Sequence, residues 1–105
     1  MLGASWEGFV IQQLMAHLNA PRERCFFWAT HAGAELDLLV VSGGRRRGFE
    51  VKRTERPTVT KSMRSAWQTL RLDSLDVLHA GEHTFPLAEG IRAVGVHRLR
   101  EDVER

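Results

Sequence analysis

Four charged residues near the middle of the chain have the types and spacing of a catalytic site: Glu35, Asp37, Glu50 and Lys52. Alternate residues of a β-strand point to the same side, so Glu35 and Asp37 would share one face of a strand, and Glu50 and Lys52 one face of the next. Carboxylates and an ammonium are costly to hold together in a small domain unless a cation offsets the repulsion, and Mg²⁺ prefers such oxygen ligands. A neighbouring lysine could orient or deprotonate an attacking water and stabilise charge on a phosphate. The pattern therefore indicates metal-assisted hydrolysis.

The two pairs can act together only if the connection between their strands brings them to one side of the sheet. Residues 43–44 are both glycine, which accepts the positive φ of a tight hairpin. A two-residue loop would place Asp37 opposite Glu50, and a four-residue loop would place Asp37 opposite Lys52, so either even loop unites the polar face. An odd loop or a bulge would send Asp37 to the far side of Glu50.

The hydrophobic pattern predicts the elements that carry these residues. Apolar side chains at helical spacing predict helices over residues 5–18 and 60–72, with Ser5 as the cap of the first. Strands are predicted over residues 25–30, 34–41 and 47–54, with short strands at 75–79 and about 83–87. Residues 91–96 have the composition of a further strand, and the charged tail from Arg98 that of a short helix. Helix, three strands, helix, two strands is the order of an α/β domain with a central mixed sheet flanked by helices.

In the strand over residues 34–41, Leu36, Leu38 and Val40 alternate with the acidic residues. Strict alternation would place these three apolar side chains on one face, opposite Asp37. We therefore expect Leu36 and Leu38 to point to the same face of the sheet.

Length and composition limit the chain to one small domain, taken as residues 1–105. Cys25 is the single cysteine, which excludes a disulfide framework and a thiolate metal cluster. No apolar run is long enough to span a bilayer and no signal peptide is visible, so a cytoplasmic protein without membrane contact is expected. Neither a phosphate-binding P-loop nor a Gly-x-Ser-x-Gly nucleophile motif occurs. The sequence therefore supports neither nucleotide binding by a P-loop nor a hydrolase with a serine nucleophile.

The segments AELDLLV (34–40) and GFEVKR (48–53) together resemble the D…(D/E)XK signature of the PD-(D/E)XK nuclease superfamily. The likeness is nearest to the restriction-endonuclease-like domain at the C-terminal end of many prokaryotic AAA-type ATPases. There a helix carries a glycine, an aromatic residue and a glutamate, as Gly3, Trp6, Glu7 and Phe9 do here, and a G-x-E-x-D strand and an E-V-K strand follow. The likeness runs from about residue 3 to residue 96 and implies a restriction-endonuclease-like core.

Carried over by position, the resemblance implies that Asp37 and Glu50 are ligands of Mg²⁺ or Mn²⁺, that Lys52 is the catalytic lysine, and that Glu7 is an auxiliary acid. The helix dipole also favours an acid in the first turn, so Glu7 has a structural alternative. Glu35 is either an accessory ligand or the partner of Lys52, and the partner role is slightly favoured. Superfamily members of the RecB-like exonuclease type add a glutamine and a tyrosine after the E-x-K strand, and this chain has no tyrosine.

Basic residues gather in one part of the chain: nine lie between residues 44 and 72 against two acids, a local charge of +7. On the second predicted helix they occupy the outer face, which suits the backbone phosphates of DNA. The residues expected to bind nucleic acid are Arg53, Lys61, Arg64, Gln68 and Arg71. The arginines at residues 45–47 are interpreted as a solubilising turn. His79 and His83 are interpreted as surface histidines, because strand-like flanks do not pair residues four apart as metal ligands.

These inferences predict a metal-dependent nuclease-like domain that hydrolyses or binds DNA phosphodiesters, a detached part of an ATPase system if the resemblance holds. The alternative is a catalytically inactive domain of the same fold that docks a partner protein or an ATPase module. A homodimer is a further expectation, because so small a chain has few elements beyond its core to form a substrate groove.

Overall fold

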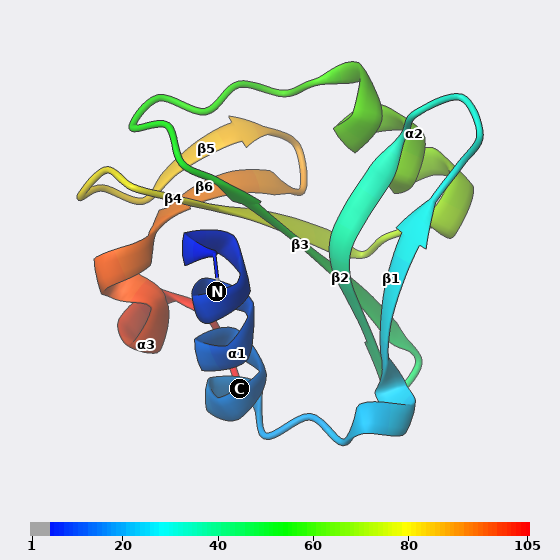
Figure 1. The fold of residues 1–105 in the computed structure, drawn as a ribbon, viewed down its shortest axis with the longest axis horizontal. Helices are drawn as coiled ribbons and strands as arrows, with labels where there is room; N and C mark the ends of the chain where they lie inside the picture. Colours follow the sequence, from blue (N-terminus) through cyan, green and yellow to red (C-terminus); the bar gives the residue numbers. More distant parts are fainter. Residues whose placement is uncertain (1–4) are drawn as a thin grey trace.

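Six strands form one mixed sheet in the order β1-β2-β3-β4-β6-β5, with helices on both faces (Figure 1). The computed structural model describes residues 5–105, so Gly3 of the predicted first helix lies outside the described residues. The strands are β1 (Cys25–Ala29), β2 (Glu35–Ser42), β3 (Arg45–Lys52), β4 (Ser74–His79), β5 (Phe85–Ala88) and β6 (Ile91–Gly95). The helices are α1 (Trp6–Leu18), α2 (Lys61–Leu70) and α3 (Leu99–Asp102), with 3₁₀ turns η1 (Arg22–Arg24) and η2 (Val96–Arg98). The predicted mixed α/β architecture is confirmed, and three strands follow α2.

Two hydrophobic cores lie on the two faces of this sheet. On one face, α1 packs through Val10 and Leu14 against a core that includes Phe49 of β3. On the other face, α2 packs through Met63 and Ala66 against β2, β4 and β6. Figure 1 shows α1 and α3 on one side of the sheet and α2 on the other. Each fully buried large apolar side chain stabilises the fold by roughly 1.5–3 kcal/mol. The packing of helices on both faces therefore stabilises the sheet from both sides.

Local sequence defines where the two longer helices begin and end. The Ser5 hydroxyl accepts a hydrogen bond from the Gly8 N–H at 3.0 Å, and Asn19 ends α1 in the left-handed conformation at φ 50°. Thr60 caps α2 by accepting from the Met63 N–H at 3.1 Å. Caps of this kind satisfy amides that the first helical turn leaves unpaired, and each contributes about 1 kcal/mol. The predicted cap at Ser5 is confirmed. No helix within residues 5–105 has the length and apolar character to cross a membrane.

The turn between β2 and β3 contains two residues, Gly43 and Gly44, at φ 59° and 79°. Both angles lie in the left-handed region that glycine adopts without steric cost. The antiparallel register continues without a shift as far as Leu38 opposite Phe49. The chain then passes through α2 and returns as β4, which pairs with β3 in parallel. A parallel neighbour needs such a long crossover connection. The even loop predicted from the two glycines is confirmed.

The other neighbour of β2 meets it with a β-bulge. The pairing advances by two residues on β1, from Phe26 to Trp28, but by three on β2, from Leu39 to Leu36. The extra residue reverses the alternation of side chains, so Leu36 enters the core under α2 while Leu38 enters the core under α1. The prediction that Leu36 and Leu38 share a face is therefore wrong, because strict alternation holds only in a strand without a bulge.

His79 is buried at the end of β4, so its interpretation as a surface histidine is wrong. Its Nδ1 accepts a hydrogen bond from the Gly81 N–H at 3.0 Å, and its Nε2 lies 2.7 Å from the His83 carbonyl oxygen. Because Nδ1 accepts, the proton of the neutral ring is assigned to Nε2, which donates to that carbonyl. The ring is buried because it satisfies two backbone groups of the tight turn after β4. The side chain of His83 is exposed, as expected.

Candidate functional site

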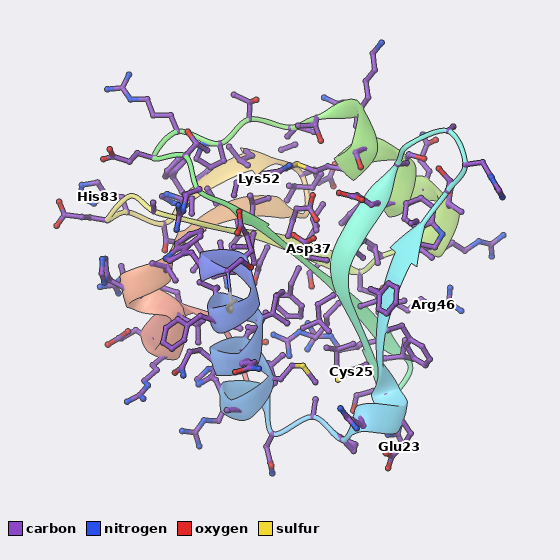
Figure 2. The ribbon with its side chains drawn as sticks, viewed as in Figure 1. Glu23, Cys25, Asp37, Arg46, Lys52 and His83 are labelled. Atoms are coloured by element: carbon purple, nitrogen blue, oxygen red, sulfur yellow. The ribbon has the colours of Figure 1, made fainter. Side chains whose placement is uncertain are left out.

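Strands β2 and β3 diverge beyond the pair formed by Leu38 and Phe49, and two carboxylates lie where they separate (Figure 2). The Asp37 N–H donates to Glu50 Oε1 at 3.0 Å, and the Val51 N–H donates to Asp37 Oδ2 at 2.8 Å. Each carboxylate thus satisfies an amide of the opposite strand that the sheet ladder no longer pairs. We call this place, with Asp37, Glu50 and Lys52, the strand fork. The two-residue loop, one of the two even loops that the sequence allowed, brings the two carboxylates together here.

Glu50 is the buried member of the strand fork. Its side chain is 3% exposed, whereas that of Lys52, whose Nζ lies 3.7 Å from Glu50 Oε2, is 42% exposed. Burial raises the pKa of Glu50 to about 7, and the charge of Asp37 and a hydrogen bond with its carboxyl act in the same direction. The Asp37 amide and the Lys52 ammonium act in the opposite direction but do not outweigh burial. When both carboxylates are ionised, the positive charge of Lys52 does not offset their repulsion and the burial of Glu50. Glu50 therefore gains or loses a proton near neutral pH.

The strand fork opens toward the face of the sheet that α2 covers. Phe49 and Val51 belong to the core under α1, so Glu50 and Lys52, which alternate with them along β3, point to the other side. Lys52 is the last residue of β3 and is labelled with Asp37 in Figure 2. The site thus lies on one helix-bearing face, at the end of the sheet where the strands separate.

Glu35, at the start of β2, is attached to α2 through a residue that the sequence analysis missed. The Glu35 N–H donates to Ser62 Oγ at 2.8 Å, and the Ser62 hydroxyl donates to the Glu35 carbonyl oxygen at 3.0 Å. Nothing in the local sequence marks Ser62 for this role, because its partner lies 27 residues away. Within residues 5–105 Lys52 pairs with Glu50, so the favoured pair between Glu35 and Lys52 is not formed. The diverging strands separate those two side chains.

Glu7 remains apart from the strand fork. It is exposed in the first turn of α1, and α1 packs on the opposite face of the sheet from Glu50. In the part of the chain that the structure describes, no group of three or more Asp, Glu, His or Cys residues could hold a metal ion. The structure therefore brings together Asp37, Glu50 and Lys52, and leaves Glu7 and Glu35 outside.

The exposed face of α2 carries most of the residues expected to bind nucleic acid. These exposed side chains are Lys61, Arg64, Gln68 and Arg71, which we call the basic row. The row begins next to the start of β2, because Ser62 contacts Glu35. Arg53 lies elsewhere: its guanidinium carbon sits 5.6 Å from the centroid of the Trp6 ring, on the α1 side of the sheet. The structure thus groups four of the five candidates and separates Arg53.

Two arginines of the β2–β3 hairpin, which was interpreted as a solubilising turn rather than a binding loop, also anchor other segments. Arg46 Nη1 donates to the Leu70 carbonyl oxygen at 2.9 Å, at the C-terminal end of α2. Arg47 Nη2 donates to the Glu104 carbonyl oxygen at 2.7 Å. These bonds connect residues distant in the sequence, which is why the local pattern does not reveal them.

The fold and the strand fork define a small mixed α/β domain with paired carboxylates and a lysine where two strands separate. Over residues 2–99 the chain matches the family described as a domain of unknown function (DUF4143), and it belongs to that family. It is 52% identical over 98 residues to the uncharacterized protein Mb2031c of Mycobacterium bovis and to the uncharacterized protein Rv2008c of Mycobacterium tuberculosis. The match covers 93% of this chain and 22% of each relative, so the chain spans about a fifth of their length. No solved structure matches the chain significantly.

Proposed function

We propose that this chain is a metal-dependent nuclease domain of the PD-(D/E)XK type that hydrolyses DNA phosphodiester bonds. The observation that carries the proposal is the buried Glu50 carboxylate beside Asp37, a pair whose repulsion the side chains of the fork do not offset. Buried carboxylates with raised pKa values are typical of functional sites, because folding alone does not favour them. The chain order of one helix, three strands, a crossover helix and a parallel strand supports a restriction-endonuclease-like core.

The strand fork suits a hard divalent cation such as Mg²⁺ or Mn²⁺. Backbone N–H groups fix one oxygen of Asp37 and one of Glu50, so both ligands are oriented beforehand. A nearby cation favours the ionised form of Glu50, which burial otherwise disfavours. Two protein carboxylates are enough for Mg²⁺, because it commonly keeps several waters and takes phosphate oxygens as further ligands. A bound divalent ion supplies Lewis-acid polarisation of the phosphate.

Lys52 is the proposed catalytic lysine. Its ammonium reaches Glu50 Oε2 at 3.7 Å while the side chain stays partly exposed, so it can face solvent and substrate together. From that position it orients the attacking water and stabilises the negative charge that develops on the phosphate.

The basic row on α2 is the proposed contact to the DNA backbone. Its side chains are exposed on the same face as the strand fork, and it starts next to β2. Arginine and lysine at this spacing neutralise phosphates without reading the bases, so binding would be largely independent of sequence.

The test is calorimetric titration of Mg²⁺ and Mn²⁺ into the 105-residue chain, with cleavage of single- and double-stranded DNA assayed in parallel. We expect metal binding that Asp37→Asn abolishes, and cleavage that both Asp37→Asn and Lys52→Ala abolish while the circular dichroism spectrum is unchanged. Glu55→Gln is the matched control, because Glu55 is an exposed acid just beyond β3 and its loss removes the same charge without touching the fork. Cleavage that survives Asp37→Asn, or a folded chain that binds no metal, would contradict the proposal.

A second candidate is a catalytically inactive domain that docks a partner protein, an ATPase module or a second copy of itself. The observation that favours it is the edge strand β1, where Phe27 is 85% exposed and Phe26 is 49% exposed. An uncharged edge strand with exposed aromatic side chains is suited to pairing with another chain. Absence of metal binding by the folded chain, with partner binding that tolerates Asp37→Asn and Lys52→Ala, would support this candidate.

A further inference from the structure

A cleft of about 160 Å³ lies at the opposite end of the β2–β3 pair from the strand fork. Its walls come from the C-terminal end of α1, the segment that leads into η1, and the ends of β2 and β3, which approach one another at the bottom of Figure 1. Four arginines line it, and no acidic residue does: Arg24, Arg45, Arg47 and Arg105. We call it the arginine cleft. The Ser42 hydroxyl is also in its wall.

The positive charge of the arginine cleft is poorly offset. Within residues 5–105 the one ion pair made by these four side chains joins Arg45 to Glu104 at 3.7 Å, and both partners are more than half exposed, so the pair is weak. Arg47 donates to the neutral carbonyl of Glu104, and the charges of Asp76 and Glu104 act on it without forming an ion pair. The C-terminal end of α1 adds roughly half a negative charge. Guanidinium groups therefore outnumber the negative charges placed against them.

Arg47 shows the imbalance most directly. Its Nε is buried and has no hydrogen-bond partner, and among the described residues it is the one buried side-chain nitrogen or oxygen in that state. A buried donor without an acceptor costs about 1–3 kcal/mol, and such a group often marks an ion or water that completes the site. Burial lowers the pKa of Arg47, and the like charge of Arg45 lowers it further. The unpaired Nε and the lowered pKa of Arg47 both favour a negatively charged hydrogen-bond acceptor beside this side chain.

We propose that the arginine cleft binds a phosphate group, either as free inorganic phosphate or as the terminal group of a small phosphomonoester. A tetrahedral oxyanion offers several acceptor oxygens, and arginine guanidinium groups match them through paired N–H donors. The Ser42 hydroxyl adds a neutral donor. The volume suits one such group and excludes a bulky ligand.

This site is separate from the strand fork and does not rest on the proposed nuclease function. Arg47 has the same parity along β3 as Phe49, over whose ring its guanidinium carbon lies at 5.4 Å, so it faces the α1 side of the sheet. Glu50 faces the α2 side and lies about 10 Å further along the strand. The arginine cleft and the strand fork can thus be tested independently on one chain.

The test is a titration of inorganic phosphate into the ¹⁵N-labelled chain at constant ionic strength, followed through the Nε–H signals of the arginines. We expect the Arg47 Nε–H signal to shift and saturate, with chloride at the same ionic strength producing no such shift. Arg24→Gln, which removes an exposed guanidinium, should weaken phosphate binding about tenfold while the other signals keep their positions. Arg47→Gln should weaken it at least as much.

Arg56→Gln is the matched control, because it removes one exposed arginine charge from the loop after β3, outside the arginine cleft, and should leave phosphate affinity unchanged. A parallel titration with glycerol phosphate distinguishes the two ligand sources: equal affinity indicates that a phosphomonoester is accepted, and binding of inorganic phosphate alone indicates the free ion. A linear, non-saturating shift, or the same affinity in Arg24→Gln, Arg56→Gln and the unaltered chain, would overturn the proposal, since either result reports only general electrostatic attraction.

Discussion

Replacing Glu50 by glutamine is expected to stabilise the fold at mildly alkaline pH and to leave its stability unchanged in acid. Glu50 has a pKa raised from 4.5 to about 7 because it is buried beside Asp37. At about 1.4 kcal/mol per pKa unit, this difference corresponds to about 3 kcal/mol of cost for the ionised form in the folded chain. Glutamine keeps an oxygen that can accept from the Asp37 N–H but carries no charge.

The sign follows from proton linkage. Because the folded pKa of Glu50 lies above the unfolded value, the folded chain holds the extra proton between about pH 4.5 and pH 7. The associated stability is fully present below the unfolded pKa and is lost as the pH rises through the folded pKa. Glu50→Gln should therefore match the unaltered chain at about pH 4 and exceed its unfolding free energy by about 3 kcal/mol at about pH 8.

Urea unfolding followed by tryptophan fluorescence, with a chelator present, measures this difference at both pH values. Groups that titrate alike in the two variants cancel in the comparison. Glu55→Gln is again the control, because this exposed acid should change the unfolding free energy by less than about 0.5 kcal/mol at either pH. If Glu50→Gln were as stable as the unaltered chain at about pH 8, or less stable, burial would not be the dominant influence on Glu50 and the reasoning would fail.

Three further predictions follow from single contacts. Arg64→Gln should weaken DNA binding about equally for all sequences and reduce its salt dependence by about one charge, as a filter-binding series over salt concentration would show; an effect confined to one sequence would contradict the backbone role. His79→Ala should lower the unfolding free energy in urea by about 3 kcal/mol, because two backbone groups lose their partners and a cavity forms, while His83→Ala, whose carbonyl is retained, should cost little; equal effects would refute the buried role. Gly90→Ala should lower the melting temperature more than Gly44→Ala, because both have positive φ but only at Gly90 would the new Cβ overlap the Trp67 ring of α2. Equal shifts would show that backbone strain alone matters.

The hairpin is the part of the site that could be predicted best. Two adjacent glycines favour a tight turn, and any even loop turns Asp37 and Glu50 to the same face. The helices were also recognisable, because helical spacing and the cap at Ser5 are local signals. The positions of these elements and the turn between the two strands therefore followed from short-range rules.

The bulge in β2 and the burial of His79 could not be predicted. The bulge depends on how β1 pairs with β2, and its result is that Leu36 and Leu38 enter different cores. His79 is buried because the turn after β4 folds back over its ring. Both outcomes depend on contacts that the polar or apolar type of the residue does not encode.

The sequence by itself determined the mixed α/β class and the tight turn between the two strands that carry the acidic residues, because periodicity and turn chemistry act over a few residues. Only the tertiary structure decided that Glu50 is buried with a raised pKa, that Lys52 pairs with it rather than with Glu35, and that Glu7 stays apart. Desolvation and electrostatic coupling depend on which distant segments cover a side chain, and these are known only once the sheet is assembled and both of its faces are packed.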